Sequence, residues 1–138
     1  MTVDVGLTHI ALAASNLDKS IAFYARYARM VVVHDRIDTE TDIRVIWLSD
    51  KTRPFVVVLF QLDKPKVILE PLAHLGVGCS SREEVDSLSK QAKEEGVLIK
   101  EPTDSGYPVG YWALLKDPDG HTLELSYGQE IGLTIDKT

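Results

Sequence analysis

The stretch Leu72–Ser80, LAHLGVGCS, decides the fold, because it repeats an earlier stretch, Leu7–Ser15, LTHIALAAS. Each copy has a histidine in third place, His9 in the first and His74 in the second, so the repeat spacing is 65 residues (74 − 9). Such a repeat predicts two copies of one unit, because one unit alone cannot cover its apolar face. The two histidines are therefore the first candidates for a shared site.

The first predicted unit, residues 5–62, is a strand, a helix and three further strands. Residues 7–13 alternate with two largely buried faces, which is typical of a strand. Ser15 or Asn16 then caps a helix, and its apolar stripe consists of Leu17, Ile21, Tyr24 and Ala28. Three apolar runs predict the remaining strands, at Met30–Ile37, Ile43–Ser49 and Phe55–Leu62.

The second predicted unit, residues 72–128, repeats this order after a proline-containing connector at 63–71. Ser81 caps a helix that Gly96 ends, and a short strand at 97–100 precedes a turn-rich loop at 101–110. Two strands at 111–116 and 122–127 form a hairpin, and the tail at 129–138 has no strong pattern. Because the connector is short, we expect one α+β domain over residues 1–138, with two tandem βαβββ units.

Composition narrows the class of partner. The chain has 138 residues, is 44% hydrophobic and 26% charged, and carries a net charge of −6, which is typical of a soluble globular protein without a basic face for nucleic acid. A single cysteine, Cys79, excludes an intrachain disulfide. No apolar run reaches the roughly 20 residues of a membrane span, and no signal peptide precedes residue 7, so we expect a cytoplasmic protein.

A carboxylate in the second unit is the third candidate ligand. Glu124 lies in the last strand between two leucines, where a buried charge is costly unless it is paired or coordinated. The repeat spacing maps it to Leu59, so three of the four symmetry-related positions can bind a metal. Two imidazoles and one carboxylate suit a catalytic Fe(II), Mn(II), Zn(II), Co(II) or Ni(II) site with open positions. Alternatively, Glu124 faces solvent, and each histidine is a hydrogen-bonded core residue.

Other residues are candidates for the substrate pocket. Tyr107, Tyr111 and Trp112 lie in or beside the turn-rich loop, where a pocket rim is expected, and Trp47, Phe60 and Gln61 are candidates from the first unit. For each aromatic residue, core packing is the alternative interpretation. His34 and His121 are candidate acid–base groups, with His121 expected to be exposed after the turn Asp117–Gly120.

These motifs resemble the vicinal oxygen chelate superfamily, which includes glyoxalase I, fosfomycin-resistance enzymes, methylmalonyl-CoA epimerase, extradiol dioxygenases and bleomycin-binding proteins. The resemblance runs from GLTHIAL and SNLDKSIAFY, within Gly6–Tyr24, to DPDGHTLEL, Asp117–Leu125. It implies that the two units form a curved, cup-like mixed sheet around a divalent ion, often completed in a homodimer. The implied metal ligands are His9, His74 and Glu124, with Glu124 also the implied catalytic residue.

Two departures from the family pattern narrow the chemistry. Glyoxalase I and the epimerase place Glu or Gln where the repeat puts Leu59, and Gln61 substitutes for it only through a bulge or register shift. Extradiol dioxygenases and fosfomycin transferases place a tyrosine ten residues before the glutamate, where this chain has Leu114.

The expected function is a metal-dependent lyase or isomerase that binds two oxygens of a small substrate and stabilises an enolate or oxyanion. One alternative is an extradiol-type dioxygenase that uses Fe(II). The other is a non-enzymatic, bleomycin-type drug-binding protein. Pairing of the units within one chain or by exchange between subunits stays open at this point.

Overall fold

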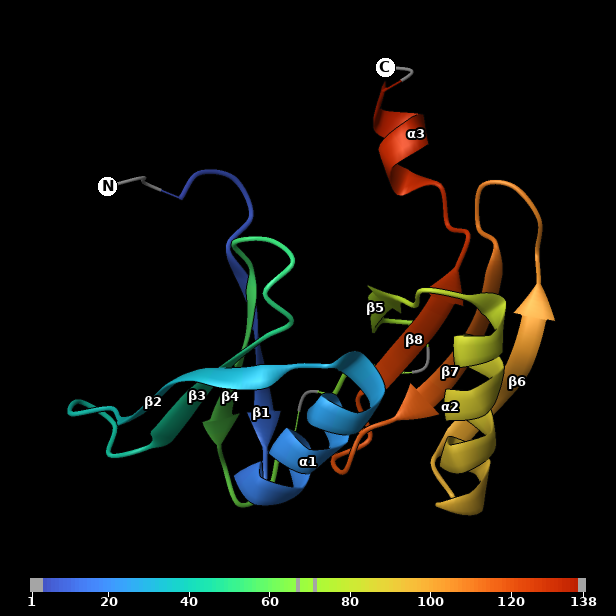
Figure 1. The fold of residues 1–138 in the computed structure, drawn as a ribbon. Coiled ribbons are helices and arrows are strands. Elements are labelled where there is room, and N and C mark those ends of the chain that lie inside the picture. The colour runs from blue at the N-terminus through green and yellow to red at the C-terminus, as the bar shows by residue number, and fades with distance from the viewer. Residues whose placement is uncertain (1–3, 67, 71, 137–138) are drawn as a thin grey trace. The chain divides into compact units, whose positions relative to one another are not determined.

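The computed structural model describes residues 4–66, 68–70 and 72–136, and it contains two compact units that divide between Ile68 and Leu69 (Figure 1). Each unit has a four-stranded mixed sheet and a helix, so the α+β class and the two βαβββ units are confirmed. The division lies inside the connector that the sequence predicts. That residues 1–138 act as one domain stays a prediction.

Unit one contains one helix and four strands, which are connected as βαβββ. Strands β1 and β4 are parallel, whereas β4, β3 and β2 are antiparallel neighbours, in the order β1-β4-β3-β2. The bounds are β1 (His9–Ala14), α1 (Leu17–Ala28), β2 (Val31–Ile37), β3 (Arg44–Ser49) and β4 (Val56–Gln61).

Unit two has the same connectivity and the order β5-β8-β7-β6, again with a parallel central pair. The correspondence between the two orders confirms the internal repeat. The bounds are β5 (His74–Gly78), α2 (Arg82–Glu94), β6 (Leu98–Asp104), β7 (Tyr111–Lys116), β8 (Thr122–Tyr127) and α3 (Ile131–Asp136).

Local hydrogen bonds set the start of each long helix. The Asn16 side chain accepts from the backbone N–H of Lys19 at 3.1 Å, so Asn16 rather than Ser15 caps α1. The Ser81 hydroxyl accepts from the backbone N–H of Glu84 at 3.0 Å and caps α2, as the sequence predicts. Gly96 follows α2 with a φ of 74°, a left-handed conformation that favours glycine.

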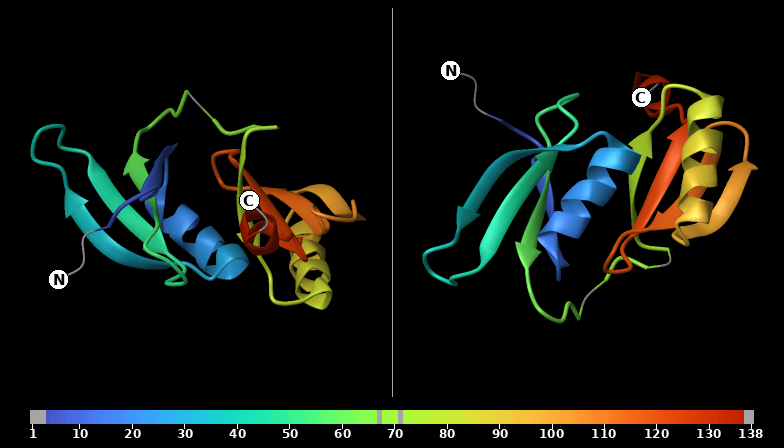
Figure 2. Two further views of the ribbon diagram at one scale, coloured as in Figure 1. Left: turned by 90° about the horizontal axis from the view of Figure 1, so that it is seen from above. Right: turned by 60° about the horizontal axis from the view of Figure 1, so that its bottom comes forward.

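Each sheet has two different faces (Figure 2). One face, here the helix face, packs against the helix of its own unit, and its aliphatic side chains are fully buried: Ile46, Leu48 and Leu59 in unit one and Leu115, Leu123 and Leu125 in unit two. The opposite face, here the open face, carries His9, Trp47 and Val58 in unit one and His74, Leu114 and Glu124 in unit two. Because side chains alternate along a strand, all candidate ligands are on open faces.

Strand register corrects one predicted correspondence. Glu124 pairs with Gly76, and the equivalent pair in unit one joins Ala11 to Val58. The counterpart of Glu124 is therefore Val58, not Leu59, which lies on the helix face. The reason is a one-residue difference in chain length, because His74 and its partner Thr122 are 48 residues apart, whereas His9 and Val56 are 47 apart.

Two further elements differ from the sequence prediction. Strand β6 continues to Asp104, into the stretch that was expected to be a loop. Pro102 is tolerated because β6 is an edge strand with register shifts on either side of Lys100. The tail contains the short helix α3, which the sequence pattern does not reveal.

The core positions of α1 are also rotated from the predicted stripe. Leu17, Tyr24 and Ala28 are buried as expected, but Phe23 and Tyr27 are buried in place of Ile21, which is half-buried. No helix in the described part of the chain has the length and apolar character to cross a membrane.

Candidate metal centre and substrate hollow

The centre of unit two's open face is a histidine–carboxylate pair. His74, on β5, and Glu124, on β8, approach each other with 3.4 Å between Nε2 and Oε2. The Glu124 residue is only 8% exposed, whereas His74 is exposed. A nearly buried carboxylate needs a positive partner, and His74 is the ionisable group that contacts it among the described residues.

The His74 ring is held by its other nitrogen. Nδ1 lies 2.7 Å from the backbone carbonyl oxygen of Leu72, and because a carbonyl oxygen only accepts, Nδ1 is the donor. With its proton on Nδ1, a neutral ring presents a lone pair on Nε2 to a carboxylate oxygen of Glu124. Two acceptors facing each other require a proton or a cation between them.

This donor pair fits a divalent metal ion. The 3.4 Å separation is less than twice the ~2.0–2.2 Å length of a metal–nitrogen or metal–oxygen bond, so one ion can contact both atoms. A backbone carbonyl that fixes the distal ring nitrogen is the usual support for a metal-bound histidine. Imidazole and carboxylate together suit the first-row transition metals and zinc.

The neighbours of Glu124 on the sheet are small or apolar. Gly76 lies beside it on β5, and a Cβ atom at Gly76 would stand 3.3 Å from Glu124 Oε2. Leu114 is its partner on β7 and offers no hydroxyl. The carboxylate therefore has space on one side and an apolar surface on the other.

His9 lies in unit one, at the start of β1, and its Nδ1 is 2.9 Å from the Thr8 hydroxyl. Over residues 4–66, 68–70 and 72–136, no group of three or more His, Cys, Asp or Glu side chains forms a metal cluster. The structure thus brings together the two predicted ligands of unit two, and His9 lies on the equivalent strand of unit one.

A hollow of about 480 Å³ surrounds His9 on unit one's open face. Trp47 lines it from β3, and its indole ring contacts the ring of His34, with 4.7 Å between the centroids. Trp47, a predicted pocket residue, therefore lies beside a predicted ligand. The remaining lining residues are Asp4, Thr8, Val33, Arg36, Ser49, Arg53, Pro54, Phe55, Val56 and Val58.

Two predicted pocket residues lie on helix faces. Gln61 alternates with Leu59 on β4, and its side-chain amide lies 3.5 Å from the Ser15 carbonyl oxygen, away from His9. Tyr111 alternates with Trp112 on β7, and its hydroxyl donates to the carboxylate of Asp86 on α2. Neither side chain shares an open face with the candidate ligand of its unit, because each has the parity of the helix-covered residues.

Trp112 and Tyr107 are placed differently. Trp112 pairs with Ser126 on the open face of unit two, and its indole N–H donates to the Ser105 hydroxyl at 2.8 Å. Tyr107 is 62% exposed in the loop before β7. Trp112, on β7, shares a face with Glu124, whereas Tyr107 lies on the loop that leads into β7.

His121 corrects another expectation, because it is 1% exposed rather than solvent-facing. Its Nδ1 accepts a hydrogen bond from the backbone N–H of Leu69 at 3.0 Å, and the Thr122 N–H donates to the Leu69 carbonyl oxygen. His121 therefore fastens the end of the connector to unit two. It is a structural residue, not an exposed acid–base group.

The shifted pKa values belong to two helix-face ion pairs and to one phenol–carboxylate hydrogen bond. A hydrogen bond from Arg44 lowers the pKa of Asp35, and hydrogen bonds from the Gly106 backbone N–H and from Arg82 lower the pKa of Asp104. The hydrogen bond to Asp86 raises the pKa of Tyr111. Arg82 also lies over the Tyr111 ring, 3.9 Å from its centroid.

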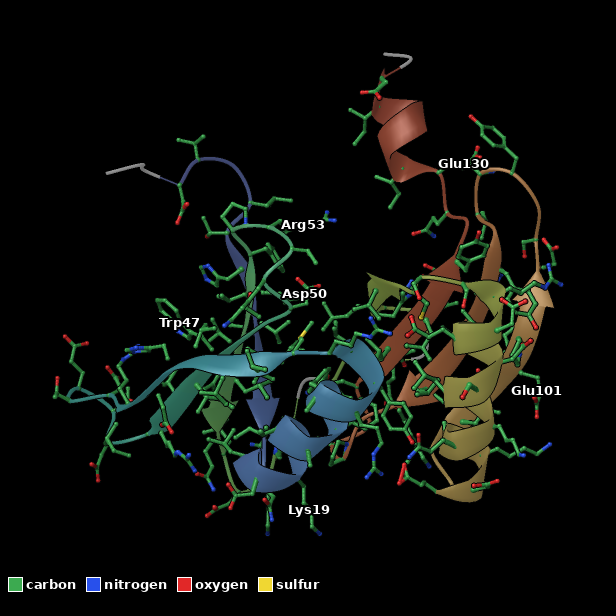
Figure 3. All side chains as sticks on the ribbon, in the orientation of Figure 1. Lys19, Trp47, Asp50, Arg53, Glu101 and Glu130 are labelled. Atoms are coloured by element: carbon green, nitrogen blue, oxygen red, sulfur yellow. The ribbon has the colours of Figure 1, made fainter. Side chains whose placement is uncertain are left out.

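Sequence reasoning missed three contributors to these sites. Gly76 makes room for the Glu124 carboxylate. The sequence signal for it is that the repeat aligns Gly76 with Ala11, so the second unit has a smaller residue at this position. Arg36 and Arg53 line the hollow beside His9 (Figure 3 labels Arg53 and Trp47). Arg36 alternates along β2 with the right parity, but Arg53, on the loop between β3 and β4, has no sequence signal.

Comparison with known proteins agrees with this architecture. Residues 6–125 match the family model for the glyoxalase/bleomycin resistance protein/dioxygenase superfamily. A protein of Pseudomonas aeruginosa, described as uncharacterized, is 37% identical over 129 residues, which are 91% of each chain.

Solved structures share the fold at low sequence identity. A possible glyoxalase from Bacillus cereus has a TM-score of 0.69 at 21% identity, over 89% of this chain and 99% of that one. The fosfomycin resistance protein FosX from Listeria monocytogenes, complexed with Mn(II) and 1S,2S-dihydroxypropylphosphonic acid, has a TM-score of 0.69 at 20% identity, over 96% and 99%. TnmS3, an antibiotic binding protein from Streptomyces sp. CB03234, has a TM-score of 0.65 at 19% identity, over 92% and 98%.

The superfamily thus contains both enzymes and binding proteins on one scaffold. The match covers both units, from the strand that carries His9 to the strand that carries Glu124. The chain belongs to the glyoxalase/bleomycin resistance protein/dioxygenase superfamily.

Proposed function

We propose that the protein is a divalent-metal-dependent enzyme of the glyoxalase type, with His9, His74 and Glu124 as metal ligands. The observation that carries the proposal is the 3.4 Å approach of His74 Nε2 to the nearly buried Glu124 Oε2, with the ring held at Nδ1 by the Leu72 carbonyl oxygen. The Mn(II) in FosX, a protein of the same fold, supports a metal of this class. The proposed ion is Fe(II), Mn(II), Zn(II), Ni(II) or Co(II).

When bound, such an ion supplies Lewis-acid polarisation of two substrate oxygens, which favours an enolate or related oxyanion in a lyase or isomerase reaction. Around the ion, the chain's own residues would orient the Glu124 carboxylate and exclude water. Leu114 removes water from one side of the Glu124 carboxylate, and Gly76 leaves space for it. We assign the catalytic role to Glu124 because it is the buried carboxylate of the proposed centre.

Metal binding by matched variants tests the proposal. The full chain is stripped with a chelator, reloaded with Zn(II) or Mn(II), and examined by elemental analysis and calorimetry. His74→Ala and Glu124→Gln are expected to weaken metal binding by about 100-fold or more, and His9→Ala by at least about tenfold. His34→Ala is the control, since His34 is an open-face histidine outside the proposed ligand set, and it is expected to bind like the wild type.

Two results contradict the metal proposal. One is a wild-type protein that retains and gains no transition metal. The other is His34→Ala weakening metal binding as much as His74→Ala, which would mean that the chain binds metal through scattered histidines.

We further propose that the protein acts as a homodimer on a small-molecule substrate, as is common in this superfamily. In an exchanged site, His9 of one copy serves the His74–Glu124 pair of another, and mixing His9→Ala with Glu124→Gln subunits then restores about a quarter of the sites. In a site formed within one chain, mixing restores none. Stoichiometric metal content after denaturing and refolding the mixture distinguishes the two arrangements.

A non-enzymatic drug-binding function is the second candidate. The mostly apolar hollow beside Trp47 and the likeness to the antibiotic-binding protein TnmS3 support it. Under this alternative, His9→Ala and His74→Ala leave ligand affinity nearly unchanged. A dioxygenase with the same three ligands is distinguished by oxygen uptake with catechols after anaerobic loading with Fe(II).

A further inference from the structure

We infer that the substrate is a small organic anion with a flat apolar body, and that Arg36 and Arg53 recognise its anionic group. The inference rests on the proposed function, because the hollow that contains both arginines also contains His9. It narrows the substrate of that site from any oxygen-chelating molecule to one with a carboxylate or phosphonate.

The first step is to ask which arginines of unit one already have an acidic partner within the fold. Arg44 donates to both oxygens of Asp35, at 3.1 and 2.8 Å, and so its charge is used within the fold. In the described part of the chain, no ion pair or side-chain hydrogen bond joins Arg36 or Arg53 to an acidic group. Both arginines that line the hollow therefore keep their guanidinium donors for another partner.

The second step is the charge balance of the hollow. Arg36 and Arg53 contribute two positive charges and Asp4 contributes one negative charge, while the whole chain carries a net charge of −6. A net positive hollow on an acidic protein is a local exception. Guanidinium groups bind carboxylates and phosphonates through paired, charge-assisted hydrogen bonds, which are stronger than neutral ones.

The third step is the shape of the rest of the ligand. Trp47, Val33, Val56, Val58 and Phe55 provide an aromatic and aliphatic lining over a volume of about 480 Å³. Such a volume is in the range of small-molecule sites. A flat apolar body can therefore stack on the indole while its anionic group contacts the arginines.

Binding of three small probes to the metal-free full chain tests the inference. Benzoate, benzyl alcohol and benzylamine have the same ring and differ in charge. Calorimetry gives their affinities, and Trp47 fluorescence in a Trp112→Phe background reports the location, since the chain has two tryptophans. Benzoate is expected to bind at least about tenfold more tightly than either other probe.

Charge-matched variants locate the preference. Arg36→Gln and Arg53→Gln are each expected to weaken benzoate binding about tenfold and to leave benzyl alcohol unchanged. Arg44→Gln removes the same charge from the helix face of the same sheet and is expected to have no more than about a twofold effect. Asp4→Asn is expected to strengthen benzoate binding slightly. Equal affinity for the three probes, or an equal loss in Arg44→Gln, overturns the inference.

The metal proposal and this inference fail separately. Arg36→Gln and Arg53→Gln should bind Zn(II) like the wild type, whereas His74→Ala should lose Zn(II) and keep metal-free benzoate binding. A protein that binds Zn(II) but shows no anion preference disproves the inference alone. A protein that prefers benzoate but binds no metal disproves the proposed function alone.

Discussion

The two units have one topology but different open faces. Both place a histidine at the same position of the first strand, yet the partner strand carries Glu124 in unit two and Val58 in unit one. The strand beside that position has Gly76 in unit two and Ala11 in unit one. Unit two thus has a donor pair with room for it, whereas unit one has a substrate-sized hollow. A repeated fold does not imply repeated chemistry.

The helix faces show a second contrast at equivalent positions. Unit one uses Arg44 at the start of β3, which pairs with Asp35 on β2 and lies 3.9 Å from Asp18 on α1. Unit two uses Tyr111 at the start of β7, whose hydroxyl donates to Asp86 on α2. An ion pair and a phenol–carboxylate hydrogen bond thus occupy equivalent positions in the two sheets. The ion pair is lost at acid pH and the hydrogen bond at alkaline pH.

The largest expected effect tests which residue of unit one corresponds to Glu124, since the 65-residue repeat predicts Leu59 and the strand register gives Val58. Leu59 is fully buried on the helix face, so Leu59→Ala should lower the free energy of unfolding by about 2–5 kcal/mol. Val58→Ala, a half-buried open-face change one residue away, should cost about 1 kcal/mol. Urea denaturation of the metal-free chain measures both. Equal costs would contradict a register in which Leu59 faces the helix and Val58 the open face.

Making unit two resemble unit one should weaken the proposed metal binding. Glu124→Val replaces a nearly buried carboxylate by the residue of the equivalent position in unit one. Metal affinity should fall about 100-fold, which is about 2.7 kcal/mol. The metal-free protein should be at least as stable as the wild type, because the buried carboxylate is no longer desolvated. Unchanged metal content would contradict the ligand assignment.

The reverse change tests whether unit one can gain a donor. Val58→Glu introduces a carboxylate beside the His9 strand and should destabilise the metal-free chain by about 1–3 kcal/mol. In a Glu124→Val background, which lacks the carboxylate of the proposed native centre, added Zn(II) should recover part of that loss, as read from the shift in melting temperature with metal concentration. No dependence on Zn(II) would indicate that His9 is not positioned as a ligand.

A smaller effect concerns the glycine beside Glu124. Gly76→Ala places a Cβ atom 3.3 Å from Glu124 Oε2, so the carboxylate must shift by a few tenths of an ångström, and metal affinity should fall about tenfold. Gly78→Ala is the matched control on the same strand and face, since nothing lies within 4 Å of its added Cβ atom. Calorimetry with Zn(II) compares the two, and similar losses would mean that β5 flexibility rather than carboxylate position is responsible.

The smallest effects are the pH responses of the helix faces. The pKa of Asp35 is lowered by Arg44, so this contribution to stability is present above the ordinary carboxylate pKa and is lost as the pH falls through the depressed value. The pKa of Tyr111 is raised by Asp86, so its contribution is present below the ordinary phenol pKa and is lost at more alkaline pH. Asp35→Asn should flatten the acid limb of the stability profile and leave the alkaline limb unchanged.

Ultraviolet titration near 295 nm checks the tyrosine response. The difference between wild type and Tyr111→Phe should titrate above the ordinary phenol range, and Asp86→Asn should move it back towards that range. A Tyr111 midpoint that does not respond to Asp86→Asn would show that the hydrogen bond is not the cause.

Most of the fold follows from local sequence patterns. The repeat at His9 and His74, the caps at Asn16 and Ser81, and the alternating strands specify both units and their connectivity. Strand β6 was predicted too short because a proline and turn residues mask an edge strand whose register shifts accommodate them. Helix α3 was missed because six residues provide too little periodicity to distinguish a helix.

The candidate site was predictable only in part. The structure pairs His74 with Glu124, two of the three ligands that the family resemblance implies. Repeat arithmetic misplaced the counterpart of Glu124, since a one-residue difference in length reverses the face. Tyr111 and Gln61 have the wrong parity for the open faces. Arg53 comes from an irregular loop, whose conformation depends on tertiary contacts that no periodic pattern encodes.

The attachment of Leu69 to His121 also limits how far the two halves of the protein can separate. Beyond Gln61, the last residue of β4, only eight peptide steps lead to Leu69, and a fully extended chain of that length spans at most about 28 Å. This covalent reach sets the effective concentration of one half around the other. Replacing His121 would leave Leu69 held by the Thr122 N–H alone, and it would thereby loosen the anchored end of the tether without adding a residue.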